Sequence, residues 1–325
     1  MRAQPTDDLV HDFPFDPTYG YDLDALLAVP APEAPDGFDD FWRARHAEAR
    51  AVDVAAELGP VEWEAGGFRA HGVTFTSTGG FRLGGWLTLP ADGNVVRGLV
   101  SVHGYSGRDR PEPETLLPGT AAIWPCARGI GARSLRDDLP APAAGHVLQG
   151  IGSRETYIHG GCAGDVWCAA TALLHLVPEA AGRLGYSGIS FGGGIGALAL
   201  PWDDRFRVAA LVVPSFGQYP LRLTMPCVGS GEAVRTHHAE HPEVVEVLRY
   251  FDAATASTRT RIPVHVGAAL FDPAVQPPGQ FAVYNALAGP KELFVTTAGH
   301  FEYPGKAAEK RALLASEHEF FLARE

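Results

Sequence analysis

The residues best suited to chemistry lie in the stretch 185–194, which reads GYSGISFGGG. Within it, Gly188-Ile-Ser190-Phe-Gly192 matches G-x-S-x-G, the pattern of a sharp strand-to-helix turn that exposes a serine hydroxyl. Residues 183–186 favour a short strand before the turn, and the Ala- and Leu-rich run 195–200 favours a helix after it. The flanking glycines allow a tight turn and close neighbours. Ser190 is therefore the candidate nucleophile, the alternative being a glycine-rich turn that only happens to hold a serine.

A serine hydroxyl is a weak nucleophile until a base removes its proton. In hydrolases built on such a turn the chain order is Ser, acid, His, each on a loop after a strand. Asp272 follows the strand-like run 263–267, and His300 follows the run 292–296. Taken singly, Asp272 is equally a turn residue before a proline and His300 a loop histidine. Their order after consecutive strands favours a Ser190–Asp272–His300 triad in which Asp272 orients the imidazole.

Three other carboxylates are weaker candidates for the acid: Asp203 and Asp204 follow the expected helix 195–200 too closely, and Asp252 lies in the segment 215–260. The oxyanion formed by an attacking serine needs backbone N–H donors from two places. The residue after the nucleophile, Phe191, would supply one, and Tyr105, in the loop after the strand 98–102, would supply the other. The neighbouring His103 is read as structural packing at a strand end, because the triad already has its base.

The rest of the chain is expected to form the scaffold for these residues. Strand-like runs alternate with helix-like runs, which is typical of a mostly parallel sheet with helices on both faces. We predict an α/β-hydrolase fold, α/β in class, as a single domain over residues 1–325, with an N-terminal extension at 1–60 and a helical, cap-like insertion at 215–260. The expected strands are 73–77 and 81–89, forming a hairpin, then 98–102, 121–126, 183–186, 208–213, 262–267 and 292–296. The expected helices are 38–52, an amphipathic 163–177, 195–200 and 306–322, and 130–161 is expected to be a long ordered loop.

Composition excludes several classes of function. The chain has 325 residues and a net charge of −12, with no basic stripe, so nucleic acid is not an expected partner. We expect neither a signal peptide nor a membrane span, because the first residues are polar and acidic and no apolar run has the necessary length. None of its four cysteines sits in a C-x-x-C pair, so we expect buried thiols in the reducing cytoplasm. His237, His238 and His241 lack metal-ligand spacing, no phosphate loop is present, and no cofactor is expected.

From about Phe38 to its end the chain resembles the acetyl xylan esterase and cephalosporin C deacetylase family, carbohydrate esterase family seven. The residues that carry the resemblance are His103-Gly-Tyr-Ser-Gly107, Arg128-Gly129, Gly145-His-Val-Leu148, Glu155-Thr-Tyr157, the turn at Ser190, Asp272-Pro273, Tyr284-Asn285 and His300. The resemblance implies the same triad, oxyanion donors at Tyr105 and Phe191, a small pocket suited to acetyl, and a ring-shaped homohexamer whose sites face an inner cavity.

The chain departs from the family pattern at three places. Ile130 and Phe191 stand where the family has glutamines, and Phe301 separates His300 from Glu302. We expect a serine esterase that removes acetyl groups from small acetylated substrates, such as acetylated sugars, xylo-oligosaccharides or cephalosporin-type acetates. Because the two replacements make the site more apolar, an esterase or lactonase for a less polar or natural-product ester is the alternative. A silent hydrolase fold kept as a binding module is the third hypothesis.

The N-terminal segment is rich in aromatic residues, namely Phe13, Phe15, Tyr19 and Tyr21. These side chains must cover either their own domain or a neighbouring subunit, since exposed apolar surface on a soluble protein marks an interface. Closed symmetric oligomers are the common way to bury such a surface. We therefore predict a homo-oligomer, and the family resemblance points to six subunits.

Overall fold

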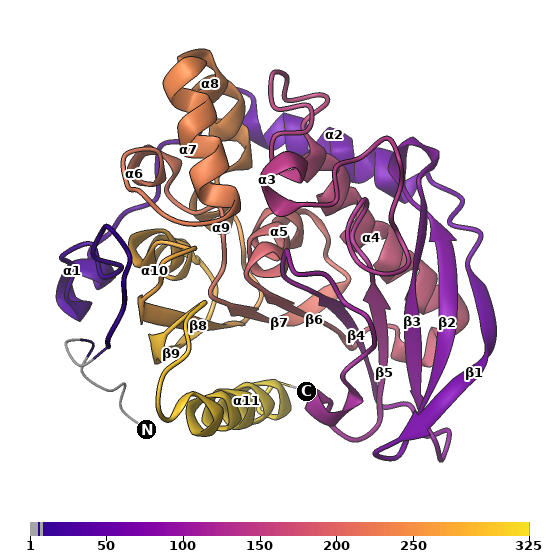
Figure 1. Cartoon of the computed structure of the whole chain (residues 1–325). Helices are drawn as coiled ribbons and strands as arrows, with labels where there is room; N and C mark the ends of the chain where they lie inside the picture. The colour runs from indigo at the N-terminus through magenta and orange to yellow at the C-terminus, as the bar shows by residue number, and fades with distance from the viewer. Residues whose placement is uncertain (1–5, 7–8, 325) are drawn as a thin grey trace.

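A computed structural model of the protein describes residue 6 and residues 9–324. Its centre is a sheet of nine strands in the order β1-β2-β3-β5-β4-β6-β7-β8-β9 (Figure 1). The strands are β1 Glu57–Ala65, β2 Phe68–Thr76, β3 Arg82–Pro90, β4 Arg97–Val102, β5 Thr120–Pro125, β6 Leu184–Ile189, β7 Phe206–Val212, β8 Val264–Phe271 and β9 Lys291–Ala298. The strand β1 thus begins inside the segment that the sequence assigned to the N-terminal extension.

The direction of the strands divides the sheet into two parts. The strands β1, β2, β3 and β5 pair antiparallel, whereas β5, β4, β6, β7, β8 and β9 pair parallel. The predicted hairpin is β2 and β3, joined through Thr78–Gly80, with Thr76 opposite Arg82. The mostly parallel sheet is therefore as predicted, and its parallel part brings the carboxyl ends of six strands to one edge.

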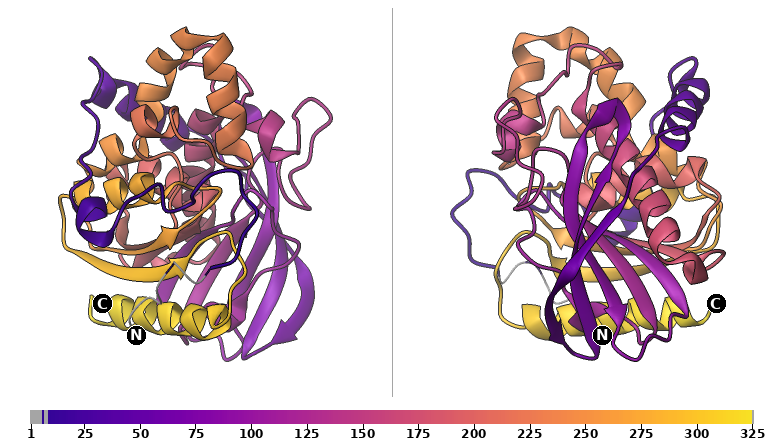
Figure 2. Two further views of the ribbon diagram at one scale, coloured as in Figure 1. Left: turned by 60° about the vertical axis from the view of Figure 1, so that its left-hand side comes forward. Right: turned by 90° about the vertical axis from the view of Figure 1, so that its right-hand side faces the viewer.

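Helices cover both faces of the sheet. The helices α4, α5 and α10 pack on one face, and α11 packs on the other against β7, β8 and β9 (Figures 1 and 2). The helices are α1 Leu23–Leu27, α2 Phe38–Arg50, α3 Ala143–His146, α4 Ile158–Leu176, α5 Phe191–Ala199, α6 Tyr219–Arg222, α7 Ser230–Glu240, α8 Val245–Leu248, α9 Ala253–Ser257, α10 Pro277–Ala286 and α11 Lys306–Leu322. Within the described residues, no helix combines the length and the apolar character needed to cross a membrane.

The helix α4 differs from the amphipathic helix that the sequence predicts. It begins five residues earlier, inside the expected loop 130–161, and most of its circumference is buried. The reason is tertiary: α2 packs over α4 on the side away from the sheet, so no broad face of α4 meets water (Figure 1). The short helix α3 also lies within the expected loop.

The opposite face of the sheet is less completely covered. The connection from β4 to β5, residues 103–119, is described throughout and contains only the short 3-10 helix Pro113–Thr115. A cavity of about 760 Å³ lies between the sheet and α11, and its lining includes Leu99, Phe321 and His300. This groove follows from the absence of a full helix between β4 and β5.

The segment 215–260 is only partly an insertion. Its last helix, α9, is buried and packs on α5 and α10, so it belongs to the layer above the sheet. The helices α6, α7 and α8 project beyond that layer, as Figures 1 and 2 show. The cap-like description therefore fits residues before α9, because α9 itself is part of the packed core.

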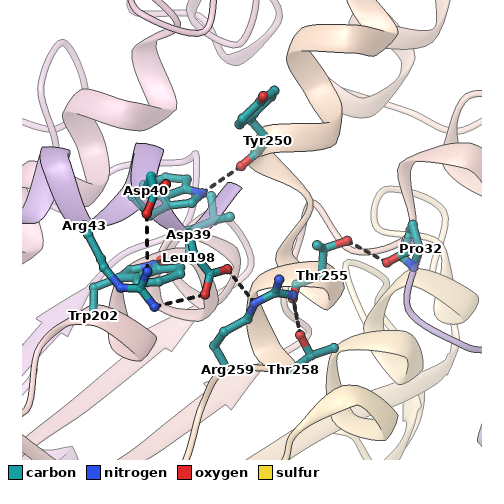
Figure 3. Close-up of polar contacts among 11 residues, drawn as sticks. Pro32, Asp39, Asp40, Arg43, Leu198, Trp202, Tyr250, Thr255, Thr258 and Arg259 are labelled. Atoms are coloured by element: carbon teal, nitrogen blue, oxygen red, sulfur yellow. Dashed lines mark hydrogen bonds and ion pairs between the residues drawn. The ribbon is translucent and has the colours of Figure 1, made fainter. Parts of the chain in front are cut away.

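The N-terminal part of the chain is tied to α9 and its surroundings by polar contacts (Figure 3). Arg259 donates from Nε to Asp39 at 2.9 Å. The Thr255 hydroxyl donates to the carbonyl of Pro32 at 3.1 Å. The indole of Trp42 donates to the carbonyl of Tyr250 at 2.9 Å. These bonds join α2 and the residues just before it to a segment more than 200 positions later in the chain.

The packing of Trp42 yields a stability prediction. Its ring is fully buried and meets the rings of Trp167 and Phe251 edge-on, with centroids 6.3 and 5.4 Å away. Replacing Trp42 by Ala should lower the free energy of unfolding by about 3–5 kcal/mol, because it leaves a large cavity and an unpaired carbonyl. Urea unfolding followed by circular dichroism measures this. Leu322→Ala, on a side chain 53% exposed, is the control and should cost less than about 0.5 kcal/mol; equal losses in the two variants would contradict the prediction.

Candidate active site

Ser190 stands at the turn between β6 and α5, where the residue is largely buried and its backbone is strained. Its φ of 55° and ψ of −113° lie in a region that residues with side chains rarely adopt. Three backbone bonds hold it there: its N–H donates to Val212 at 2.8 Å, and its carbonyl accepts from Gly194 at 3.0 Å and Ser215 at 3.1 Å. The strain is therefore maintained by the strand β7 and by the first turn of α5.

The glycines on either side of Ser190 are required by close approach. A Cβ on Gly188 would lie 2.4 Å from the carbonyl oxygen of Gly192. A Cβ on Gly192 would lie 2.4 Å from the carbonyl oxygen of Val102. No side chain fits at either distance, so the G-x-S-x-G pattern reflects the packing of this turn against the end of β4.

The structure brings Ser190, His300 and Asp272 together at the ends of β6, β9 and β8. The Nε2 atom of His300 lies 2.9 Å from Ser190 Oγ, and its Nδ1 atom lies 2.8 Å from Asp272 Oδ2. Because a carboxylate only accepts, Nδ1 carries the proton that it donates to Asp272. In the neutral ring Nε2 is then bare and accepts the Ser190 hydroxyl, so the arrangement fits a serine poised to lose its proton.

Asp272 is fully buried and each of its oxygens is occupied by donors. Oδ1 accepts from the N–H groups of Ala274 and Val275, both at 2.9 Å. Oδ2 accepts from His300 and from Nε2 of Gln280, the latter at 2.9 Å. The orientation of the Gln280 amide is fixed, because its oxygen accepts from the N–H of Ala269 at 2.8 Å.

Gln280 was missed by the sequence analysis, which did not predict the helix α10 that carries it. The run Gln276-Pro277-Pro278 at its start resembles a loop, although proline is also common in the first turn of a helix. An Asp followed eight residues later by a Gln, with a helix start between them, was the available signal.

The electrostatics of His300 favour a basic imidazole. Burial by itself lowers the pKa of this histidine. The charge of Asp272 and the hydrogen bond to it outweigh burial, and the pKa of His300 lies above its ordinary value. Asp272 therefore sets both the tautomer and the basicity of the ring.

The N-terminal aromatic segment lies against these loops on its own chain. The N–H of Asp272 donates to the carbonyl of Pro17 at 3.1 Å, and the hydroxyl of Tyr19 donates to the carbonyl of Pro226 at 2.8 Å. The Phe13 ring lies 6.1 Å from that of Phe301, next to His300. These aromatics thus cover their own chain and give no independent reason for a subunit interface, so the homo-oligomer stays a prediction.

The two expected oxyanion donors flank the serine. Phe191 is the first residue of α5, so its N–H belongs to the first turn, where a helix has no internal acceptor. A Cβ on Gly104 would lie 3.5 Å from the Cβ of Ser190, which places the loop containing Tyr105 beside the nucleophile. The rings of Tyr105 and Phe191 pack with centroids 4.5 Å apart.

Two buried histidines extend from Tyr105. The Tyr105 hydroxyl lies 3.1 Å from Nε2 of His159 and 3.4 Å from Nδ1 of His146. The other nitrogen of His146 bonds the Arg128 carbonyl at 2.9 Å and must carry the proton. Burial lowers the pKa of both histidines, so both are neutral near pH 7.

The other sequence candidates are engaged elsewhere. Asp203 forms an ion pair with Arg205 at 2.5 Å, and Asp252 caps α9 by accepting from Thr255 at 2.9 Å. Asp204 is exposed. His103 accepts from the N–H of Ala127 and donates to the carbonyl of Gly104, and burial lowers its pKa to about 4, which fits the structural role. His237 and His238 lie on α7, and the His237 ring packs 4.5 Å from that of His241.

Comparison with known proteins identifies a family and related folds. A family model described as acetyl xylan esterase (AXE1) matches residues 22–318. The acetyl xylan esterase from Paenibacillus sp. R4 superposes with a TM-score of 0.77 at 24% sequence identity, over 91% of this chain and 99% of that one. Acetyl xylan esterase 1 from Thermoanaerobacterium sp. JW/SL YS485 gives a TM-score of 0.78 at 21% identity, over 93% and 99%.

More distant enzymes share part of the same architecture. The acylaminoacyl peptidase from Pyrococcus horikoshii superposes with a TM-score of 0.62 at 18% identity, covering 80% of this chain and 42% of that one. At such identities the likeness concerns the fold, and it confirms the predicted α/β-hydrolase architecture.

The contacts of His300 predict how its pKa depends on Asp272. In an Asp272→Asn variant the opposing charge is lost while burial remains, so the pKa of His300 should fall below 6.5, its ordinary value. An NMR titration of the imidazole signals measures this. Asp252→Asn, at another buried carboxylate that does not touch His300, is the matched control and should leave the pKa in place. A His300 pKa that stays above 6.5 in Asp272→Asn would refute the assignment of the cause.

Proposed function

Because the chain belongs to the acetyl xylan esterase family, and is thereby a carboxylic ester hydrolase, we propose that it removes acetyl groups from small acetylated substrates through Ser190, His300 and Asp272. The observation that carries the proposal is the chain of hydrogen bonds from Ser190 Oγ to His300, at 2.9 Å, and from His300 to Asp272, at 2.8 Å. It joins a strained nucleophile, a base and an orienting acid in the order that acyl transfer requires.

The reaction would proceed in two halves. Ser190 Oγ attacks the ester carbonyl carbon while its proton passes to His300 Nε2, and the N–H groups of Phe191 and Tyr105 stabilise the oxyanion. The tetrahedral intermediate collapses, the C–O bond to the alcohol breaks, and the imidazolium returns the proton to the leaving oxygen. Water, deprotonated by His300 Nε2, then attacks the acyl carbon; the bond to Ser190 Oγ breaks, the imidazolium returns its proton to that oxygen, and acetate leaves. Neither half needs a cofactor.

Asp272 acts through His300. It fixes Nδ1–H, so that Nε2 faces Ser190, and its charge stabilises the imidazolium formed in each half-reaction. Gln280 is a positioning residue, because it holds the Asp272 oxygen that accepts from His300.

The substrate class rests on the family, whose members point to acetylated sugars and xylo-oligosaccharides, with cephalosporin-type acetates as a related class. A specific observation favours the alternative of a less polar ester or lactone. Phe191 and Ile130 are both buried, and the Phe191 ring packs among Tyr105 and Phe216 beside Ser190. Comparing acetyl, butyryl and octanoyl p-nitrophenyl esters separates the two: a steep fall with chain length favours the acetyl pocket, and a rise favours the alternative.

We place the working enzyme in the cytoplasm as a homo-oligomer, with the family's homohexamer as the specific form and with neither nucleic acid nor membrane as a partner. The cytoplasm is favoured by the cysteines Cys126, Cys162, Cys168 and Cys227, all of which are buried free thiols. Light scattering after size-exclusion chromatography would test the assembly.

The central test of the function is Ser190→Ala. Losing the nucleophile should reduce kcat for p-nitrophenyl acetate by about a thousandfold or more. Ser187→Ala, on the same strand and outside the site, is the matched control and should keep wild-type turnover within about twofold. Near wild-type activity in Ser190→Ala would end the proposal, and failure of a fluorophosphonate probe to label Ser190 would favour the binding-module hypothesis.

The raised pKa of His300 predicts the acid side of the pH profile. The base must be neutral to accept the Ser190 proton, so kcat/KM should be highest above the pKa of His300 and fall about tenfold per unit of pH below it. Because Asp272 raises that pKa, the fall should begin above pH 6.5. The measurement is kcat/KM for p-nitrophenyl acetate from pH 5 to 9; a profile that stays flat down to pH 5 would contradict the role of His300 as base.

A further inference from the structure

Arg222, at the end of α6, is a buried cation without a counter-ion. Only 6% of the residue is exposed. Among the described residues its guanidinium has neither a hydrogen bond nor an ion pair, and its Nη1 atom is fully buried without a partner. Its neighbours are the rings of Phe216 and Tyr219, whose centroids lie 5.9 and 5.7 Å from Cζ. A buried charge in such surroundings is costly unless something pairs with it.

The arginines of this chain that are largely but not fully buried have their partners. Arg128 pairs with Asp165 at 2.5 Å, and Arg205 pairs with Asp203 at the same distance. Arg108 donates to the carbonyl of Ser101 at 2.7 Å. Arg222 therefore departs from the chain's own way of burying arginine.

The carboxylates around Arg222 are already occupied. Asp252 accepts from the N–H of Tyr219 at 2.7 Å and from Thr255, and Asp272 accepts from His300 and its other donors. Glu232 pairs with Arg235 at 2.5 Å. Within the described part of the chain, none of these three carboxylates forms a direct ion pair with Arg222.

Further polar atoms near Arg222 also lack partners. One ring nitrogen of His159 is buried without a hydrogen bond among the described residues, and the buried hydroxyls of Tyr157 and Tyr219 lie against each other with no third partner. The ring of His159 packs 4.5 Å from that of Tyr157 and 4.2 Å from that of Phe216. Burial raises the pKa of both tyrosines, that of Tyr219 to about 12, so both hydroxyls keep their protons at neutral pH, and one O–H of the pair is left to donate to a ligand.

This group of side chains adjoins the nucleophile. The N–H of Ser215 donates to the carbonyl of Ser190 at 3.1 Å, so the segment that leads from Ser215 to Arg222 begins beside the nucleophile in space. The ring of Phe216 lies 6.1 Å from that of Phe191, and His159 bonds the hydroxyl of Tyr105. Arg222 and the neighbouring tyrosine hydroxyls therefore lie close to Phe191 and Tyr105, the two residues expected to hold the oxyanion.

We propose that Arg222, with the hydroxyls of Tyr157 and Tyr219, binds a carboxylate carried by the ester substrate. The inference rests on the proposed esterase function and narrows it to acidic esters. A planar carboxylate has two oxygens that accept from a guanidinium and from hydroxyls, and such bonds are strong where water is excluded. The carboxylate belongs either to the alcohol half or to the acyl half of the substrate, and the experiment separates these two.

The experiment compares matched pairs of esters. Phenyl acetate is paired with 4-acetoxybenzoate, which carries a carboxylate in the alcohol half, and ethyl butyrate with ethyl hydrogen succinate, which carries it in the acyl half. We measure the ratio of kcat/KM, acidic over neutral ester, in wild type, in Arg222→Met and in the exposed control Arg50→Met. For one pair, Arg222→Met should lower the ratio by about 10- to 100-fold, mainly through KM, while Arg50→Met leaves it unchanged. Tyr157→Phe and Tyr219→Phe should lower the same ratio by about 2- to 10-fold.

A binding measurement keeps this inference separate from the esterase proposal. Calorimetric titration of Ser190→Ala with 4-acetoxybenzoate and with ethyl hydrogen succinate should detect binding of one of them, and Ser190→Ala combined with Arg222→Met should lose it. If the wild type hydrolyses none of the four esters but this binding persists, the esterase proposal fails and the carboxylate site stands.

Two outcomes would overturn the carboxylate site. One is that Arg222→Met leaves the acidic-over-neutral ratio of kcat/KM unchanged for both pairs, and that neither acidic ester binds to Ser190→Ala. That result would mean that water alone fills the site. The other is a thermal unfolding midpoint several degrees lower in Arg222→Met together with an unchanged ratio, which would make Arg222 a structural residue.

Discussion

The buried hydrogen bond between Asp272 and His300 is the contact on which the rest of the site depends. It joins the loops after β8 and β9, and through His300 it reaches Ser190 after β6. The parallel sheet delivers these loops to one edge, and the surrounding structure then fixes the carboxylate with donors from its own loop and from Gln280 on α10. If Asp272 turned away, His300 would lose both its tautomer and its basicity. The fold thus fixes the carboxylate of Asp272 in a fully buried position, where its hydrogen bond to His300 is strong.

Both residues of the proposed proton transfer, Ser190 and His300, are held in unfavourable backbone conformations. Ser190 has a φ of 55° and His300 a φ of 45°, and neither is glycine. Each conformation costs about 1–3 kcal/mol, which only a well-packed surrounding can sustain. For Ser190 that surrounding is β7 and the start of α5. The surrounding structure therefore brings Ser190 and His300 together and also prevents their backbones from relaxing to dihedral angles of lower energy.

The sequence was informative where chemistry follows local order and silent where it depends on tertiary neighbours. The order of Ser190, Asp272 and His300, each after a strand, sufficed to predict their meeting, and the helix α11 has the bounds that were predicted for it. The burial of α4 was not predictable from its own periodicity, because it results from α2. Gln280 was missed because Pro277 and Pro278, at the start of α10, made that stretch look like a loop. The lack of a partner at Arg222 has no signal in the sequence, since an unpaired charge is a property of the folded chain.

The contact between the N–H of Asp272 and the carbonyl of Pro17 joins parts of the chain separated by 255 positions. With Tyr19 fastened to Pro226 and Phe13 packed near Phe301, the N-terminal segment buttresses the loops of both the acid and the base. For anyone who produces the enzyme, this makes the N-terminal side a poor place for an affinity tag. A protease that nicks the segment ahead of Thr18 would likewise alter catalysis without touching a residue of the reaction centre, and batches that differ in such clipping would differ in specific activity.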